Sequence, residues 1–278
     1  GDGSGGGDGN IFVIEACEYM ENFLNYSPDI LIILNIDYDH PDYYKNEIEY
    51  FNAFNKLAIK AKQVIANGDD KYARKLIGNN IIYFGTDSYN DYQFEYYNGK
   101  VIIDNYAFKF PLYGKHYAYD LVASYIAMKK IGISYVRMID VLKKFKMPKR
   151  RFEIKKINNT IIIADYAHHP TEIKALYSTI KEKYPNLSNC IIFEPHTYTR
   201  TNAFKEEFKE ALGLFDECYL LPIFTSIREG RNISLENELY SYLSYSVINS
   251  NDINSLIDKY RVLLLVGAGN IYNYFLKL

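Results

Sequence analysis

The sequence predicts an α/β protein built on parallel sheets, and two observations carry that expectation. Short apolar runs with strand character alternate with helical periodicity along most of the 278 residues. Such alternation is typical of parallel sheets with helices on both faces. The composition also changes at residues 146–151, where proline and basic residues gather. We therefore expect two domains, over residues 1–149 and 150–278.

The apolar runs and the helical periodicity place the expected elements. We expect strands at residues 11–14, 30–36, 63–66, 80–84, 160–164, 190–193, 218–223 and 262–266. We expect helices at residues 46–62, 117–130, 171–184, 202–212, 234–244 and 270–277. Segment 92–110 differs, because its alternation is centred on Asn98-Gly99, a strong hairpin signal. Pro170 and Glu172 suit the first turn of a helix, where a missing N–H costs nothing and negative charge is favoured.

Charge and cysteine usage exclude several classes of partner. The net charge is −2, so we expect neither nucleic acid nor an anionic membrane as a partner. No apolar run approaches the length of a membrane span. Cys17, Cys190 and Cys218 stand in strand-like contexts without paired spacing, so we expect reduced, buried thiols and a cytoplasmic protein. The oligomeric state stays open.

Polar residues follow five of the expected strands, and they suit chemistry better than packing. These strand ends hold four of the five histidines of the chain. The ligand crevice of an open α/β sheet lies outside the carboxyl ends of its strands. The stretch Asp165–Glu172, behind the apolar run 160–164, is therefore the first place to look for a site.

One strand-end cluster suggests a metal. Glu15 and His40 offer an oxygen and an imidazole ligand for a hard divalent cation. Asp37 and Asp39 favour this interpretation, since unpaired carboxylates in a crevice are costly without a cation. The alternative is a solvated loop carboxylate and a capping histidine.

A second cluster follows the strands expected at 160–164 and 190–193. His168, His169 and His196 suit general bases, metal ligands or hydrogen-bond donors to an anion. Adjacent histidines at a helix entry cannot share one face, so we expect one to contact substrate and the other to support the loop. Arg200 suits a bidentate contact to carboxylate or phosphate, with a surface arginine as the alternative. Residues 267–269 (Gly-Ala-Gly) allow a close backbone approach to an anion, although this signal is weak by itself.

The residues alone leave three functions open. The first is a metal-dependent phosphoryl-transfer enzyme that acts on carboxylates. The second is a metal-dependent phosphohydrolase. The third is a non-catalytic binding fragment or degenerate homologue.

The motifs taken together resemble the Mur ligases. The matching segments follow the order and spacing of that family and cover residues 12–19, 35–43, 150–153, 165–172, 195–201 and 267–269. The resemblance implies part of a P-loop-type central ATPase domain in residues 1–149. It implies a Rossmann-like domain that binds ATP and an amino acid in residues 150–278.

Within the family, the chain looks most like the members that join L-alanine to UDP-N-acetylmuramate. The resemblance implies carbon–nitrogen bond formation in peptidoglycan precursor synthesis, with ATP and Mg²⁺ as cofactors. ATP would phosphorylate the sugar carboxylate to an acyl phosphate, which the amine then attacks. Glycine or serine as acceptor, and a relative that reattaches recycled murein peptide, stay as alternatives.

The resemblance also assigns roles to individual residues. Glu15 and His40 would bind magnesium. The residues implied for the ATP site are Asn35, Asp120, Arg151 and Asp165. The alanine pocket would be formed by Tyr166, His168 and Arg200. Arg200 would hold the alanine carboxylate, and Glu15, His40, His168 and Arg200 would be the catalytic residues.

The sequence departs from the family pattern in three ways: a missing phosphate loop and the residues at positions 120 and 197. No GxxGK(S/T) phosphate loop occurs in the sequence, so we expect this chain by itself to be inactive. The chain begins without Met on a glycine-rich segment, which indicates either a linker or entry into the middle of a longer protein. Asp120 stands where asparagines of the family usually contact adenine, and Thr197 where many relatives carry arginine.

Overall fold

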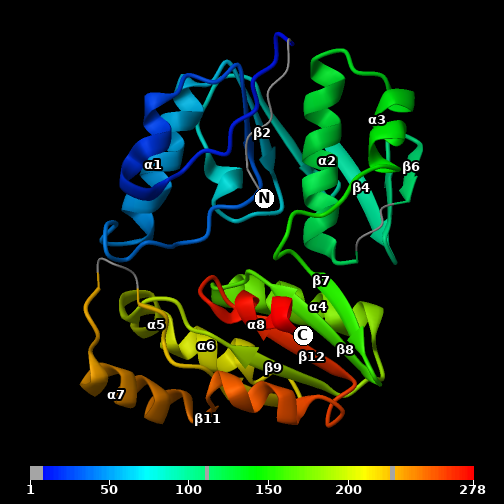
Figure 1. Cartoon of the computed structure of the whole chain (residues 1–278). Coiled ribbons are helices and arrows are strands. Elements are labelled where there is room, and N and C mark those ends of the chain that lie inside the picture. Colours follow the sequence, from blue (N-terminus) through cyan, green and yellow to red (C-terminus); the bar gives the residue numbers. More distant parts are fainter. Residues whose placement is uncertain (1–8, 110–112, 226–228) are drawn as a thin grey trace. The chain divides into compact units, whose positions relative to one another are not determined.

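A mixed sheet of six strands forms the centre of each half of the chain (Figure 1). The computed structural model describes residues 9–109, 113–225 and 229–278. The chain divides into two units, Gly1–Phe145 (unit 1) and Lys146–Leu278 (unit 2). In both units most neighbouring strands are parallel, and helices pack on the sheets, which confirms the predicted α/β class.

The sheet of unit 1 follows the order of the chain. Its strands are β1 (Ile30–Ile33), β2 (Gln63–Asn67), β3 (Ile81–Gly85), β4 (Tyr92–Tyr97), β5 (Lys100–Ile103) and β6 (Tyr106–Lys109). The pairs from β1 to β4 are parallel, and β5 and β6 continue the sheet in antiparallel pairs. Asn98 and Gly99 join β4 to β5 with positive φ angles of 46° and 73°. The predicted hairpin is therefore confirmed, because this turn needs two residues that tolerate positive φ.

Two helices of unit 1 pack on opposite faces of β2. Val64 and Ala66 lie in one core cluster with residues of α1 (Glu47–Lys60), whereas Ile65 lies in another with residues of α2 (Lys115–Lys130). The period of two in a strand sends alternate side chains to opposite faces. Both helices were predicted. The shorter elements η1 (Tyr19–Asn25), η2 (Ala73–Lys75) and α3 (Tyr135–Leu142) were not.

The strand predicted at residues 11–14 is wrong. Within the described ranges no strand pairs with this segment, and its backbone is irregular. Phe12 and Val13 expose 85% and 88% of their surface, and Ile11 and Ile14 are exposed as well. An apolar run becomes a strand only where a neighbouring strand accepts its backbone hydrogen bonds. Cys17 is also exposed, so the expectation of a buried thiol fails there, whereas Cys190 and Cys218 are buried as expected.

The sheet of unit 2 has the order β11-β10-β9-β12-β8-β7. The strands are β7 (Glu153–Ile157), β8 (Thr160–Asp165), β9 (Asn189–Phe193), β10 (Glu217–Leu220), β11 (Ser246–Val247) and β12 (Val262–Val266). All pairs are parallel except that of β7 with β8. Every residue of β9 and β12 is buried, as in strands covered on both faces. Strands β7 and β11 were not predicted from the sequence.

The helices of unit 2 largely match the prediction. They are α4 (Pro170–Lys183), α5 (Tyr198–Ala203), α6 (Lys205–Leu212), α7 (Ile233–Leu243) and α8 (Ile271–Lys277), with the 3₁₀ segment η3 (Ser250–Leu256). The single helix predicted at 202–212 is instead the pair α5 and α6, because the backbone leaves the helical region at Phe204.

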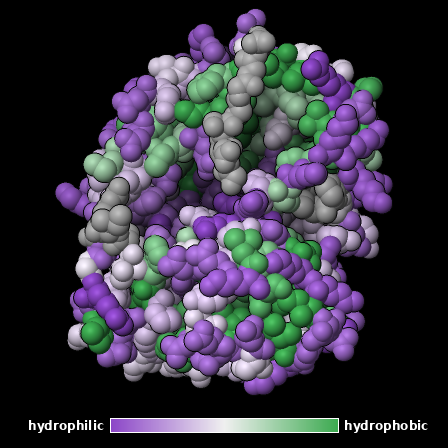
Figure 2. Space-filling view, viewed as in Figure 1, coloured by the Kyte–Doolittle hydropathy of each residue, from purple (hydrophilic) through white to green (hydrophobic). Residues whose placement is uncertain are grey.

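Hydrophilic residues and patches of hydrophobic residues alternate over the face of the molecule in Figure 2. None of the helices in the described ranges combines the length and apolar character that a membrane crossing requires.

Candidate functional site

In unit 2 the predicted site residues gather where β8 and β9 end. Both strands pair in parallel with β12, so their carboxyl ends lie at the same edge of the sheet. Asp165 is the last residue of β8, and Tyr166 and His168 follow it in the loop to α4. His196 and Arg200 follow β9, with Arg200 inside α5.

Arg200 is buried among these residues, with 8% of its surface exposed. Its Nη1 lies 3.2 Å from Nδ1 of His196. A guanidinium only donates hydrogen bonds, so Nδ1 of His196 accepts, and the His196 ring carries its proton on Nε2. The ring stacks on Phe224 at 5.4 Å and lies edge-on to His168 at 5.9 Å. Arg200 and His168, predicted for one pocket, thus both contact His196.

His168 is oriented by two acceptors. Its Nδ1 lies 3.1 Å from the carbonyl oxygen of Tyr166 and 3.3 Å from Oε2 of Glu172. Two acceptors on one ring nitrogen place the proton on Nδ1 and leave Nε2 as the acceptor of the neutral ring. The rings of Tyr166 and His168 contact edge to face at 5.2 Å. The loop therefore holds His168 in a single tautomer.

His169 supports the loop, as predicted. It is the N-cap of α4, and its Nδ1 accepts from the backbone N–H of Thr171 at 3.4 Å. Glu172 completes the capping box by accepting from the backbone N–H of His169 at 3.2 Å. Pro170 opens the helix, which confirms the helix start predicted from Pro170 and Glu172.

Asp165 and Arg151, both predicted for ATP, lie near the same loop. Asp165 accepts backbone hydrogen bonds from Phe152 and Ala167, each at 2.9 Å. Burial raises the pKa of Asp165 to about 6, against the opposing effect of these two hydrogen bonds and the charge of Arg151. The Arg151 guanidinium lies 5.6 Å from the centre of the Tyr166 ring and 3.6 Å from Oε1 of Glu172.

The loop after β12 makes its close approach to a carboxylate of the protein itself. Oε2 of Glu194 accepts from the backbone N–H of Ile271 at 2.9 Å. A Cβ on Gly269 would lie 2.5 Å from that oxygen, and a Cβ on Gly267 would lie 2.7 Å from the carbonyl oxygen of Glu194. Burial raises the pKa of Glu194. The glycine loop therefore packs closely against the Glu194 side chain.

In unit 1 the predicted metal residues are arranged differently. Nε2 of His40 lies 2.8 Å from Oε1 of Glu18 and 3.9 Å from Oδ2 of Asp39. Burial acts to raise the pKa of Glu18, but the hydrogen bond and charge of His40 outweigh it and lower that pKa. Glu15 is exposed. The structure thus pairs His40 with Glu18, three residues beyond the predicted partner.

The pairing of His40 with Glu18 leaves the predicted Glu15–His40 pair unformed. Among the residues that the structure describes, no group of three His, Cys, Asp or Glu side chains is placed to hold a metal ion. His40 and Glu18 satisfy each other instead. Asn35 and Asp120, predicted for the ATP site, are both exposed.

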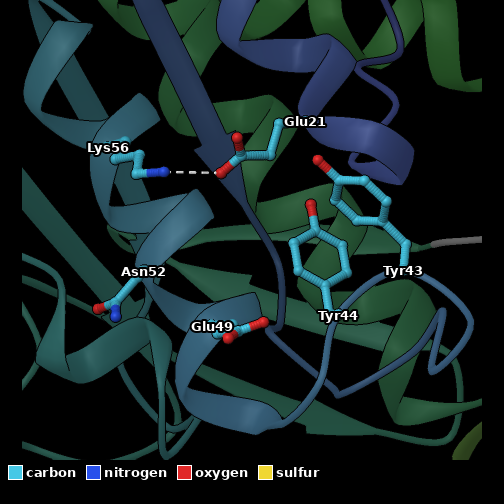
Figure 3. A pocket seen from close by; sticks show the side chains of 6 residues that line it. All are labelled: Glu21, Tyr43, Tyr44, Glu49, Asn52 and Lys56. Atoms are coloured by element: carbon cyan, nitrogen blue, oxygen red, sulfur yellow. Dashed lines mark hydrogen bonds and ion pairs between the residues drawn. The ribbon is translucent and has the colours of Figure 1, made fainter.

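A polar hollow of about 470 Å³ lies beside Glu21 and Lys56 in unit 1 (Figure 3). Tyr44 lines it and donates its hydroxyl hydrogen to the carbonyl oxygen of Glu18. In the hollow, Lys56 of α1 points to Glu21, with Nζ 2.8 Å from Oε1. Its other lining residues are Tyr43, Glu49 and Asn52. The volume is in the range of small-molecule sites.

Sequence reasoning missed Asp69, which follows β2. Its carboxylate accepts from the N–H and hydroxyl of Thr86 (2.6 and 2.9 Å), the Tyr119 hydroxyl (2.6 Å) and the Asn90 amide (2.8 Å). Burial acts to raise its pKa, but these donors lower it to about 2. Asp69 therefore ties β2 to the end of β3 and to α2. The rule that found the other sites, polar residues behind an apolar run, would have found it behind residues 63–66.

The sequence matches two domains of one family. Residues 6–128 match the Mur ligase middle domain, and residues 150–268 match the glutamate ligase domain of Mur ligases. The two matches fall in the two units and cover most of the chain. The chain therefore belongs to the Mur ligase family.

Solved structures of this family have a similar fold. UDP-N-acetylmuramate-alanine ligase MurC from Thermotoga maritima is 25% identical, with a TM-score of 0.69 over 92% of this chain and 60% of that one. A pseudomurein peptide ligase type C from Methanothermus fervidus is 17% identical, with a TM-score of 0.69 over 90% and 63%. MurF from Thermotoga maritima, solved with ADP, is 17% identical, with a TM-score of 0.64 over 90% and 60%.

This chain spans about 60% of the length of those relatives. The two matches at 17% identity support the fold alone. Mur ligases are ATP-dependent ligases of peptidoglycan synthesis.

Proposed function

We propose that the protein joins L-alanine to the carboxylate of UDP-N-acetylmuramate, with ATP hydrolysis, as a cytoplasmic step of peptidoglycan precursor synthesis. The observation that carries this proposal is the buried Arg200, which His196 holds beside His168 at the ends of β8 and β9. A buried guanidinium is suited to the carboxylate of a small amino acid. The likeness to an alanine ligase supports alanine as that amino acid.

Each residue of this pocket has a distinct role in the proposal. Arg200 binds and orients the alanine carboxylate. His168 keeps its proton on Nδ1, toward Tyr166 O and Glu172, so Nε2 can accept a proton from the alanine amine as it attacks the acyl phosphate. Tyr166 lines the pocket beside His168.

ATP supplies the phosphoryl group that activates the sugar carboxylate. We propose that Arg151 and Asp165 contribute to its site from unit 2, where both lie close to Tyr166. Asn35 and Asp120 keep the role in ATP binding that the sequence resemblance implies. Glu15 and His40 are the proposed magnesium ligands on the sequence resemblance alone. In the structure His40 pairs with Glu18.

The test is acceptor-dependent phosphate release by the complete gene product. With ATP and UDP-N-acetylmuramate present, L-alanine should give the highest kcat/KM among L-alanine, glycine, L-serine and a murein tripeptide. Preference for the tripeptide would favour a murein peptide ligase, the kind of protein named for a structural neighbour from Psychrobacter arcticus. Phosphoester cleavage without any acceptor would overturn the ligase.

The same assay on the 278-residue chain by itself is compared with the assay on the complete gene product. That chain contains no GxxGK(S/T) sequence whose backbone could cradle the ATP phosphates. We therefore expect it to release no phosphate in response to alanine. Alanine-dependent release by this chain alone would contradict the proposed dependence on a phosphate loop.

A further inference from the structure

The helix that carries Arg200 is too short to hold its own position. α5 has six residues, Tyr198–Ala203. Helices of fewer than about 12 residues are marginal without contacts from outside. The position of the Arg200 guanidinium therefore depends on what fixes α5 to the rest of unit 2.

Glu229 fixes the amino end of this helix. Its Oε2 accepts from the backbone N–H of Tyr198 at 2.7 Å, and its Oε1 accepts from the backbone N–H of Thr199 at 3.1 Å. The Thr199 hydroxyl donates to the same carboxylate. A carboxylate at this end is also favoured by the partial positive charge of the helix amino terminus. These hydrogen bonds join residues about 30 positions apart, one in the segment before α7 and the others in α5.

Thr197, in the turn that leads into α5, has an unfavourable backbone conformation. Its φ angle is 67°, an unfavourable value for a β-branched residue. Its hydroxyl oxygen accepts from the backbone N–H of Arg200 at 3.5 Å, and its own N–H donates to the carbonyl oxygen of Phe224 at 2.9 Å. Such a conformation persists only where the surrounding contacts determine it. Glu229 supplies contacts on the two residues that follow.

Tyr198 anchors the side of the same helix independently. It is 4% exposed, packs in a core cluster with Ile223 and Leu239, and donates its hydroxyl hydrogen toward Glu236 at 3.3 Å. This buried anchor keeps α5 against α7 when the Glu229 contacts are lost. A change at Glu229 should therefore alter the orientation of α5 and leave the unit folded.

We propose that Glu229 is a positioning residue for recognition of the acceptor carboxylate. It holds the start of α5 so that Arg200 meets the carboxylate of the amino acid. This role rests on the proposed amino-acid ligase function.

The first test compares Glu229→Gln with Glu238→Gln in the complete gene product. Glu238 is an exposed glutamate on α7 and serves as the matched control. Loss of a capping carboxylate should raise the KM for L-alanine about tenfold in Glu229→Gln, while kcat and the KM for ATP stay within about twofold. Glu238→Gln should match the wild type. Glu229→Asp keeps the charge and should recover most of the alanine affinity.

The second readout is amide hydrogen exchange over residues 198–203. Exchange should accelerate in Glu229→Gln and stay unchanged in Glu238→Gln, with the same melting temperature for both. An active wild type whose KM for alanine does not respond to Glu229→Gln would refute the positioning role. A wild type inactive toward every amino acid would refute the proposed function itself, and the exchange data would then report on the helix tie alone.

Discussion

Asp69 in unit 1 and Asp165 in unit 2 both lie at the carboxyl end of a parallel strand, yet their pKa values move in opposite directions. Asp69 is partly exposed and receives hydrogen bonds from Thr86, Tyr119 and Asn90, and its pKa falls to about 2. Asp165 is 8% exposed and receives two backbone hydrogen bonds, and burial raises its pKa to about 6. The balance of donors against desolvation thus decides which strand-end carboxylate stays charged.

The same contrast separates the two sets of predicted site residues. In unit 2 the fold brings His168 and Arg200 together at His196, and Tyr166 contacts His168. In unit 1 Glu15 is exposed, and His40 pairs with Glu18. The difference follows from the strands: β8 and β9 flank β12 in register, whereas no described strand precedes Glu15.

The largest effect is expected for Arg200→Ala in the complete gene product. It removes a buried charge-assisted contact worth about 2–5 kcal/mol, so the KM for L-alanine should rise about 30-fold or more. The KM for ATP should change little. Arg261→Ala is the matched control, because Arg261 is exposed and precedes β12, at the opposite end of the sheet. An unchanged KM for alanine would remove Arg200 from the pocket.

Asp69→Ala should affect stability instead of acceptor binding. Thr86, Tyr119 and Asn90 would lose their common acceptor, which should lower the free energy of unfolding by about 3 kcal/mol. Urea denaturation at neutral pH measures this. Asp29→Ala is the control, since Asp29 pairs with Lys62 at 2.6 Å but both side chains are about 80% exposed. That surface pair is screened by solvent and should contribute little to stability. An equal loss of stability in both variants would contradict the contrast between a partly buried acceptor and an exposed ion pair.

The two aspartates should also give opposite pH dependence of the free energy of unfolding. An unfolded Asp titrates near pH 3.9. The folded state keeps the Asp165 proton up to about pH 6, so its contribution to stability falls as the pH rises from about 4 to 6. The contribution of Asp69 is present above about pH 4 and is lost as the pH falls toward 2.

Urea midpoints against pH measure both effects, with Asp165→Asn and Asp69→Asn each subtracted from the wild type. The two difference curves should slope in opposite directions, downward with pH for Asp165 and upward for Asp69. Parallel curves would show that desolvation does not dominate at Asp165.

The smallest effect is expected at the hairpin of unit 1. Gly99→Ala places a Cβ at a φ of 73° and should lower the free energy of unfolding by about 1 kcal/mol. Thermal denaturation measures it. Asn98→Gly, at a φ of 46°, should not destabilise the turn. Kinetic constants for alanine should stay unchanged in both variants, because the hairpin belongs to unit 1 and the alanine pocket to unit 2.

Local sequence signals predicted the parts of the molecule that depend on neighbours in the chain. Asn98-Gly99 marked the hairpin through positive φ, and Pro170 with Glu172 marked the start of α4. The apolar runs marked most strands, and polar residues behind two of them marked the residues that gather at Arg200. The prediction failed for residues 11–14, because pairing with a distant strand decides whether an apolar run joins a sheet.

Only those site residues that directly follow a strand were predicted. His168 and Arg200 follow adjacent apolar runs of the sequence, and the parallel sheet brings those ends together. The support by Glu229 had no sequence signal, since about 30 residues separate it from the helix that it caps. Asp69 also follows an apolar run, at residues 63–66, but it was not among the predicted site residues.

Local sequence patterns were enough to predict the α/β class, most of the helices and strands, the hairpin and the edge of the sheet where polar residues collect. Those features depend on periodicity and on backbone preferences of single residues. Three contacts appear only in the folded protein: His40 pairs with Glu18, Glu194 packs against the glycine loop after β12, and Glu229 holds the helix of Arg200. Each of those contacts joins residues far apart in the chain, and which ones form depends on how the whole sheet is assembled.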